Sequence, residues 1–285
     1  MLRNEIQMKT ALTRKAIEYY EDKGLLKPIK SENGYRDYSE KDLDILMKVS
    51  ILRKLGVSVS DIEKYLSSAD NSLASVLRKK QHQLENDEKR KELLELIIRG
   101  EGQEYVKEKI ALMEAEESIY ERLERAFPGF FGHLFFAAYK PFFDEPLSED
   151  GEGAFKKYVS YLDNLAPFEL SEEEQKFVDE ASSPFDMYAL EKISEDKVKL
   201  IGNVEEWMKE NETFIMQYET YKHSEQYQNS IWGHIQEKLQ KYMQDNNYYE
   251  IAIPLIRKFS KSYDEYYEKL LEANEQFLKY KEITN

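Results

Sequence analysis

The sequence predicts a mainly α-helical protein with one small β-hairpin near its N-terminus. The 285 residues include only 11 Gly and 7 Pro, too few for the many tight turns of a β-rich fold. Apolar residues recur at helical spacing along most of the chain. Asn33-Gly34 is the strongest local hairpin-turn signal, and no convincing alternating strand follows residue 38. We therefore expect helices with a single two-stranded hairpin.

Charge is unevenly distributed along the chain. The formal net charge is −15. Residues 1–70 hold 13 Lys and Arg against 12 Asp and Glu, so the acidic excess lies in the remainder. A nearly neutral segment can bind nucleic acid if its basic groups gather on one face. We expect the acidic remainder to face solvent or a cationic ligand.

Several classes of function are excluded by residues that the chain lacks. It has no cysteine, which excludes disulfides, thiolate metal sites and cysteine nucleophiles. No apolar run is long enough for a transmembrane helix, and residues 1–10 lack the apolar core of a secretory signal. We expect a cytoplasmic protein without a metal or cofactor. The four histidines have no ligand spacing and are expected mostly at the surface: His82, His133, His223 and His234.

The first 38 residues predict two short helices and a hairpin. Thr13 can cap the second helix, and Gly24 ends it before Pro28. Residues 25–38 then form a two-stranded wing around the Asn33-Gly34 turn.

Two further helices are expected after the wing. Ser39-Glu40-Lys41-Asp42 resembles a capping box, and the helix that it opens ends at Gly56. Ser58 opens the next helix, which runs to about Leu66. Two short helices, a hairpin wing and two more helices make a winged helix-turn-helix domain.

Residues 71–98 contain neither Pro nor Gly and predict one long helix. Its apolar residues approximate a heptad seam that Lys80, Asp87 and Lys91 interrupt. The seam comprises Leu73, Leu77, Leu84, Leu94 and Ile98. A coiled-coil partner is the simplest cover for such a seam. The alternative is a helix packed within its own chain.

Three blocks in the first 66 residues resemble the DNA-binding domain of MerR-family regulators. They are Leu12-Thr13-Arg14-Lys15-Ala16-Ile17-Glu18-Tyr19-Tyr20-Glu21 with Lys23-Gly24-Leu25-Leu26-Lys27-Pro28, then Asn33-Gly34-Tyr35-Arg36-Asp37-Tyr38-Ser39-Glu40-Lys41-Asp42-Leu43, and Leu52-Arg53-Lys54-Leu55-Gly56-Val57-Ser58-Val59-Ser60-Asp61-Ile62. The resemblance covers about a quarter of the chain. It implies promoter DNA as the partner, a homodimer formed through an antiparallel coiled coil at residues 70–99, and action on RNA polymerase at the promoter.

The resemblance and the residue types together predict the DNA contacts. A second helix that presents basic and aromatic side chains can enter a major groove, and the wing can lie along phosphates. A helix start can also receive a phosphate on its free backbone N–H groups. The predicted contacts are Thr13, Arg14, Lys15, Tyr19, Tyr35, Arg36, Tyr38 and Ser58. The sequence departs from the family pattern in two places. Glu18 stands where an arginine is usual, and a carboxylate there repels phosphate. Lys9 and Thr10 stand near the turn, where the first helix usually has an apolar position.

The C-terminal part is expected to be all-helical. The pattern predicts helices near 103–126, 129–144, 151–166, 171–181, 184–193, 196–217, 220–245 and 247–281. Residues 127–146 hold seven Phe and one Tyr, so this helix is either the central core helix or the wall of an aromatic pocket for a hydrophobic, aromatic or cationic effector. The candidate ligand residues are Phe131, Phe135, Tyr139, Phe142, Glu145, Trp207 and Trp232.

The predicted organisation has three parts: a DNA-binding domain over 1–69, a dimerisation helix over 70–99 and a helical effector domain over 103–285. The predicted function is a transcription regulator that binds promoter DNA and responds to a small effector. In the alternative, the helical domain binds a protein or only stabilises the dimer. An enzyme is not expected, because the sequence has no Gly-rich phosphate loop and no zinc-type helix motif.

Overall fold

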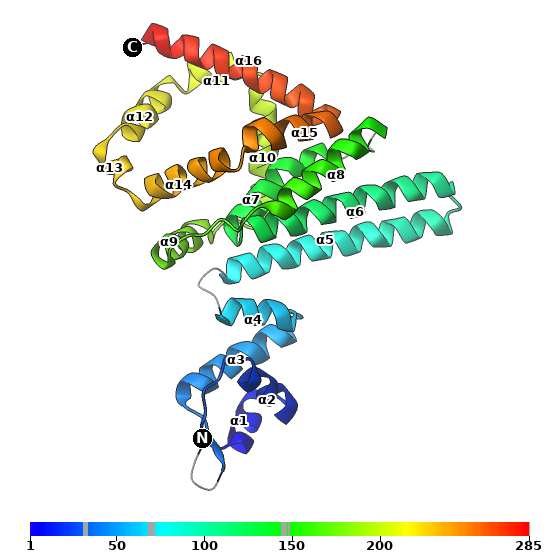
Figure 1. Cartoon of the computed structure of the whole chain (residues 1–285), viewed down its shortest axis with the longest axis vertical. Helices are drawn as coiled ribbons and strands as arrows, with labels where there is room; N and C mark the ends of the chain where they lie inside the picture. The colour runs from blue at the N-terminus through cyan, green and yellow to red at the C-terminus, as the bar shows by residue number, and fades with distance from the viewer. Residues whose placement is uncertain (31–33, 68–71, 144–146, 148, 285) are drawn as a thin grey trace. The chain divides into compact units, whose positions relative to one another are not determined.

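The computed structural model describes residues 1–30, 34–67, 72–143, 147 and 149–284. The described residues fall into two units, Met1–Lys80 and Gln81–Asn285. The fold is mainly helical, with one two-stranded sheet among the described residues (Figure 1). This confirms the predicted fold class.

The first unit has the predicted order of elements. It comprises α1 (Arg3–Thr10), α2 (Arg14–Asp22), β1 (Ile29–Lys30), β2 (Arg36–Asp37), α3 (Glu40–Lys54) and α4 (Val59–Ser67). The two strands are antiparallel, with Ile29 opposite Asp37 and Lys30 opposite Arg36. Asn33 of the predicted turn lies outside the described residues. Gly34, just after it, has a φ of 78°, a conformation that favours glycine.

The predicted helix ends of the first unit are confirmed. The hydroxyl of Thr13 accepts a hydrogen bond from the backbone N–H of Ala16 at 3.2 Å. Ser39 and Asp42 form a reciprocal capping box at the start of α3. Gly24 and Gly56 follow α2 and α3 in the left-handed conformation. These local signals fix the boundaries of α2 and α3, whose buried faces close a small core with α1.

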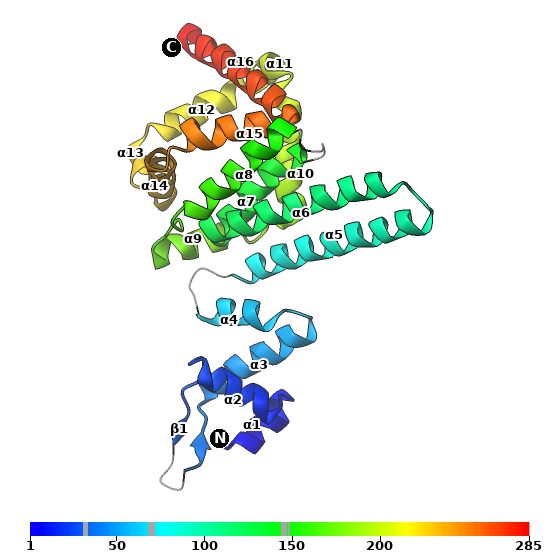
Figure 2. The same ribbon diagram turned by 45° about the vertical axis from the view of Figure 1, so that its right-hand side comes forward.

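Helix α5 (Leu73–Ile98) packs one face against α6 (Gln103–Ala126) in an antiparallel hairpin (Figures 1 and 2). The His82 ring stacks on Tyr120 with 3.7 Å between centroids. One turn further along α5, Asn86 donates a hydrogen bond to Glu117. This face of α5 therefore packs within its own chain. The five apolar residues of the predicted heptad seam lie exposed.

The remainder of the second unit begins with α7. Its elements are α7 (Phe130–Tyr139), η1 (Lys140–Phe142), α8 (Glu149–Asn164), α9 (Glu172–Ser182), α10 (Met187–Ile201), α11 (Val204–Glu210), α12 (Glu212–Lys222), α13 (Glu225–Gln228), α14 (Ile231–Asp245), the π-helical turn η2 (Tyr248–Ala252), α15 (Ile253–Phe259) and α16 (Lys261–Thr284). Phe136 and Ala137 on α7 are fully buried, and α7 contacts α6, α9 and α10. The aromatic segment is thus a central core helix.

Three predicted long helices are wrong because polar residues and glycine break them. The helix expected over 196–217 is interrupted at Gly202. Helix α10 instead combines the helix expected over 184–193 with the first residues of the one expected over 196–217. Within 220–245, the Ser230 hydroxyl accepts from the backbone N–H of Gly233 at 3.0 Å and starts α14. Within 247–281, Ser260 is extended and its hydroxyl accepts from the N–H of Tyr263 at 3.2 Å. Each serine caps a new helix where apolar periodicity alone predicts continuity.

Gly132 allows α7 to approach the end of α6. A Cβ at this position would lie 2.5 Å from the carbonyl oxygen of Phe127 and 2.9 Å from the Cα of Glu124. Both atoms belong to the backbone, so relief requires the helix ends to move apart. We expect Gly132→Ala to lower the free energy of unfolding by about 2 kcal/mol, as overpacking does in other cores.

Urea unfolding followed by Trp fluorescence measures this change, because Trp207 and Trp232 are the only tryptophans and both lie in the second unit. Gly153→Ala is the matched control, since a Cβ at Gly153 would meet no atom within 4 Å. Equal unfolding curves for the two variants would contradict the close approach.

Candidate nucleic-acid interface and effector groove

Helix α2 presents its first turn and Tyr19 to solvent. The side chain of Arg14 is 70% exposed, and Lys15 is also exposed. The Thr13 hydroxyl is engaged in the cap described above. Tyr19 is 40% exposed, and a hydrogen bond to Glu63 raises the pKa of its hydroxyl. The exposed basic groups of α2 can therefore reach a phosphate or a base edge.

A chain of ion pairs links α2 to the wing. Arg14 Nε lies 2.8 Å from Glu18 Oε1, and Arg3 Nη1 lies 2.9 Å from the same oxygen. Arg3 also lies 3.6 Å from Glu21, and Glu21 pairs with Arg36 on β2. The hydrogen bond from Arg14 helps to lower the pKa of the Glu18 carboxyl. The acid at position 18 is thus neutralised inside the chain by two arginines.

Two of the predicted DNA contacts are already engaged within the chain. Tyr38 is only 2% exposed, and its hydroxyl donates to Glu21 and accepts from Arg3 Nε at 3.2 Å. Direct phosphate contact by Tyr38 was therefore a wrong prediction, because the ring belongs to the core of the first unit. The Ser58 hydroxyl accepts from the N–H of Asp61 at 3.1 Å and donates to its carboxylate. Ser58 is exposed, but its hydroxyl caps α4.

On the wing, the predicted contacts differ in exposure. Tyr35 is 66% exposed, whereas the Arg36 side chain is half-buried against Glu21. Arg14 and Arg36 are the two ends of the chain of ion pairs described above. Arg3 and Glu21, which complete it, were missed from the sequence, because no local spacing relates Arg3 to α2.

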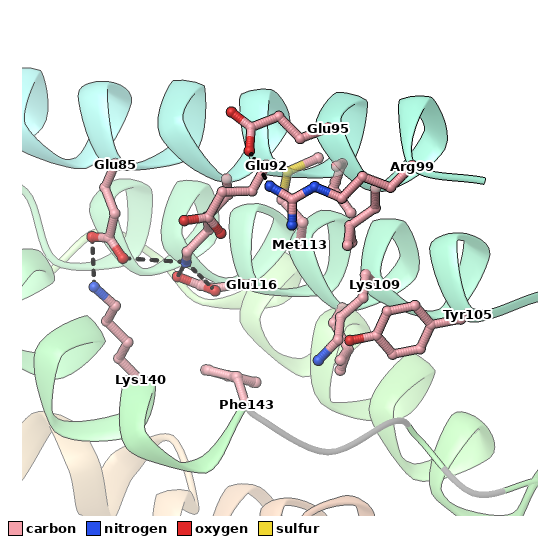
Figure 3. A pocket seen from close by; sticks show the side chains of 14 residues that line it. Glu85, Glu92, Glu95, Arg99, Tyr105, Lys109, Met113, Glu116, Lys140 and Phe143 are labelled. Carbon is pink, nitrogen blue, oxygen red and sulfur yellow. Dashed lines mark hydrogen bonds and ion pairs between the residues drawn. The ribbon is translucent and has the colours of Figure 1, made fainter. Parts of the chain in front are cut away.

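A groove of about 780 Å³ runs between α5 and α6 at the loop end of the hairpin (Figure 3). Acidic, basic and apolar side chains all contribute to its lining. Its lining comprises Glu85, Lys89, Glu92, Leu93, Glu95, Leu96, Arg99, Tyr105, Lys109, Leu112, Met113, Glu116, Lys140 and Phe143. The groove therefore offers both apolar contact and charge.

An ion-pair chain closes one end of this groove. Lys140 Nζ lies 2.6 Å from Glu85 and 2.8 Å from Glu191, and Lys89 Nζ lies 3.3 Å from Glu85 and 2.8 Å from Glu116 (Figure 3). Burial alone lowers the pKa of Lys140, but the two carboxylates outweigh it and raise that pKa. Burial likewise raises the pKa of Glu85, whereas its pairing with Lys140 and Lys89 lowers it overall.

Six of the seven predicted ligand residues lie in the described part of the chain, and these six are not gathered around one cavity. Phe131, Tyr139 and Phe142 belong to the core, and Glu145 lies outside the described residues. Phe135 lines a separate hollow of about 520 Å³ together with Tyr227 and Tyr248. The tryptophans lie apart, Trp207 on α11 and Trp232 on α14, where it packs against the core. The aromatic residues therefore serve packing first, and the groove beside α5 was missed.

The histidines divide between core and surface. His82 and His133 are buried, contrary to the expectation for most of them, whereas His223 and His234 are exposed. Among the described residues, no group of three His, Asp or Glu side chains is placed to hold a metal ion. No helix in the described part of the chain is both long and apolar enough to span a membrane.

Comparison with known proteins places the similarity at the N-terminal end. The family described as "MerR HTH family regulatory protein" matches residues 4–69. The HTH-type transcriptional regulator CueR of Salmonella typhi is 42% identical over 59 residues, 20% of this chain and 43% of that protein. CueR of Vibrio cholerae is 36% identical over 69 residues, 24% of this chain and half of that protein.

A third relative is matched over more of its length. The HTH-type transcriptional regulator HmrR of Rhizobium leguminosarum is 38% identical over 96 residues, 32% of this chain and 74% of that protein. The chain thus spans half or less of these two CueR regulators and about three quarters of HmrR. No solved structure matches the chain. The coverage of HmrR, the match over residues 4–69 and the helix-and-wing order of the first unit establish that this chain belongs to the MerR HTH family of regulatory proteins.

Proposed function

We propose that the protein is a transcription regulator that binds promoter DNA as a homodimer and changes its action when a small effector binds the second unit. The observation that carries the first part is the first unit itself. It has the helix-and-wing order of the MerR HTH family and exposes Arg14, Lys15 and Tyr19 on α2 and Tyr35 on the wing. RNA polymerase at the same promoter is the partner on which such a regulator would act.

In this proposal the domains follow the sequence prediction. Residues 1–69 bind DNA, residues 70–99 join two copies, and residues 103–285 sense the effector. Lys15 and Arg14 supply charge to the phosphates, while Glu18 opposes them. The ion pairs of Glu18 with Arg3 and Arg14 reduce this repulsion but leave each arginine shared between carboxylate and phosphate.

Two substitutions on α2 should therefore shift DNA affinity in opposite directions. Lys15→Ala removes a phosphate contact from each protomer, so DNA affinity should fall and the slope of log K against log salt should decrease by about 2 per dimer. Glu18→Gln removes the opposing charge and frees Arg14, so affinity should rise by about tenfold, or about 1.4 kcal/mol. Fluorescence anisotropy of the full chain with a labelled duplex across a salt series measures both effects.

Lys197→Ala is the matched control, because this lysine is exposed on α10 of the second unit. It should leave the affinity and the salt slope unchanged. Equal affinities for the wild type, Lys15→Ala and Glu18→Gln would mean that the first turn of α2 does not face DNA.

The groove beside α5 is the best-formed candidate for the effector site. Its apolar lining comprises Leu93, Leu96, Leu112 and Met113. The aromatic side chains of Tyr105 and Phe143 also line it (Figure 3). Glu92 is exposed on the rim and makes no ion pair in the described part of the chain. An unpaired carboxylate beside apolar and aromatic surface suits a lipophilic organic cation.

Calorimetric titration with tetraphenylphosphonium and with neutral triphenylphosphine oxide tests this assignment. We expect saturable binding of the cation, weaker binding of the neutral compound and about fivefold loss of cation affinity in Glu92→Gln, since one exposed charge contributes about 1 kcal/mol. Glu195→Gln, an exposed change on α10, should not alter binding. Binding that is identical in Glu92→Gln and the wild type would move the effector away from this groove.

A further inference from the structure

A second hollow of the second unit, of about 520 Å³, is lined by residues of α7, α12, α13, α14 and η2. We call it the α14 hollow, because α14 contributes more lining residues than any other element. Among the described residues, it shares no lining residue with the groove beside α5. Its volume lies within the range of about 300–1,000 Å³ that is usual for small-molecule sites. The α14 hollow is therefore a separate candidate site of a suitable size for a small ligand.

Four aromatic rings from three elements line the α14 hollow. They are Phe135 of α7, Tyr227 of α13, and Tyr248 and Tyr249 of η2. Tyr227 is only 9% exposed, whereas Tyr249 is 53% exposed. The rings of Tyr248 and Tyr249 meet edge to face, with 5.5 Å between their centroids. Tyr249 is thus the ring that is most open to a ligand.

Two features of the backbone bring these rings together. In the π-helical turn η2, the backbone N–H of Ile253 donates to the carbonyl oxygen of Tyr248, five residues earlier. Turns of this kind are rare and occur frequently at functional sites. At the start of α14, a side chain at Gly233 would collide with the carbonyl oxygen of Tyr227. The absence of a side chain at Gly233 therefore lets the end of α13 lie directly on the first turn of α14.

Polar groups surround the aromatic rings. Gln228, Gln236 and Gln240 line the hollow, and the last two lie one turn apart on the same face of α14. All three are exposed, and none makes a side-chain hydrogen bond within the described part of the chain. Each amide offers two donors and one acceptor oxygen. Burial raises the pKa of Tyr248, so its hydroxyl stays protonated and can also donate.

The charges of the α14 hollow favour an uncharged ligand. Lys222 and Glu237 are the charged residues that line it among the described residues, and their charges are opposite. Glu237 would repel an anion, and Lys222 would repel a cation. The α14 hollow differs in this respect from the groove beside α5, where several acidic side chains gather.

We propose that the α14 hollow binds a neutral saccharide, which stacks on Tyr249 and accepts and donates hydrogen bonds at the three glutamines. The C–H groups on one face of a pyranose ring carry a weak positive charge and pack against the negative face of an aromatic ring. The hydroxyls at the edge of the sugar both donate and accept, as amides do. A purely aromatic ligand would displace water from the amides without replacing its hydrogen bonds. The proposal depends neither on DNA binding nor on a cation in the groove beside α5.

Saturation-transfer NMR of the full chain with glucose, galactose, maltose and cellobiose tests this proposal. These sugars have no aromatic protons, so irradiation of the aromatic resonances saturates the protein alone. We expect transfer to at least one of the four sugars, strongest for the C–H protons on one face of a pyranose ring. The absence of transfer to all four sugars would overturn the assignment to a saccharide.

Four variants locate the bound sugar, with its affinity measured by titration in the same experiment. Tyr249→Ala should weaken binding about tenfold through loss of stacking, whereas Tyr249→Phe should retain it. Gln240→Ala should weaken binding about fivefold. The matched controls are Tyr188→Ala on α10, where the side chain is 72% exposed, and Gln244→Ala, which is exposed on α14 outside the lining. Unchanged affinity in Tyr249→Ala would place the sugar elsewhere and contradict the proposal.

Competition separates this site from the effector groove and from an aromatic-ligand site. Glu92→Gln should leave sugar binding unchanged, and Tyr249→Ala should leave the binding of tetraphenylphosphonium unchanged. Loss of sugar binding in Glu92→Gln would contradict two separate sites. Phenazine, a flat neutral aromatic compound, should not displace the sugar. If phenazine displaces it and binds more tightly, the α14 hollow is a site for aromatic ligands and the saccharide proposal is wrong.

Discussion

Replacing Lys140 by methionine should lower the free energy of unfolding of the second unit by about 3 kcal/mol at pH 7. Lys140 is 17% exposed and is the only cation within ion-pair distance of Glu191 among the described residues. Its loss leaves Glu191 uncompensated and Glu85 with Lys89 alone. Removing one partner of a buried ion pair generally costs about 3–5 kcal/mol, and we take the lower end because Glu85 is 36% exposed.

The deficit should depend on pH in a defined direction. Without Lys140, burial raises the pKa of both carboxyls in the folded state above the values in the unfolded chain. Protonation then favours the folded state, so the deficit of Lys140→Met should be smaller at pH 4 than at pH 7. Urea unfolding monitored by Trp fluorescence at the two pH values measures it.

Neutralising the two acids should recover most of the loss. The triple variant Lys140→Met, Glu85→Gln, Glu191→Gln removes the unpaired charges, and its unfolding free energy at pH 7 should exceed that of Lys140→Met. If the triple variant is less stable than the single variant, the loss is due to packing of the lysine stem rather than to charge.

The second large effect is the pH dependence contributed by His82. Burial lowers the pKa of this imidazole from 6.5 to about 4, and the ring is 1% exposed between Tyr120 and Phe136. Since the pKa in the folded state lies below that in the unfolded chain, the neutral ring stabilises the fold above pH 6.5. This contribution is lost as the pH falls from 6.5 to about 4 and amounts to about 3 kcal/mol.

Comparison with a variant isolates His82 from the carboxyls that titrate in the same range. A phenylalanine ring at this position would keep the stacking on Tyr120 without a titrating group. The free energy of unfolding of His82→Phe should therefore fall less than that of the wild type between pH 6.5 and 4. The exposed His234 is the control, and His234→Gln should follow the wild type. Parallel curves for the wild type and His82→Phe would show that the ring is already hydrated or charged in the fold.

The features that could be predicted from the sequence are those set by contacts close along the chain. The cap at Thr13, the capping box at Ser39 and the stop at Gly56 each depend on residues within a few positions, and all three are confirmed. The wing follows from the same kind of signal. The long helix α5 was predictable because 26 residues carry no residue that would end it.

Contacts between distant segments were not predictable in the same way. Arg3 meets Glu18 across 15 positions, and Lys140 meets Glu85 across 55, so no periodicity reveals either pair. Tyr38 was predicted to contact DNA because it lies on the wing. A tyrosine on a wing can be exposed or buried, and the sequence pattern does not distinguish the two. For the aromatic segment, the sequence left open a core helix or the wall of a pocket, and the structure shows a core helix. The groove beside α5 was missed because its charged and aliphatic residues form no recognisable sequence motif.

The central claim is that this chain binds DNA as a two-fold symmetric dimer. The most direct measurement is selection of bound sequences from a random duplex library by the full-length protein, followed by sequencing of the enriched pool. We predict an enriched inverted repeat, with half-site centres about one helical turn or a multiple of it apart, because DNA symmetry mirrors protein symmetry. An enriched single half-site without its inverted copy would contradict the dimer, and the absence of any enriched sequence would contradict specific DNA binding itself.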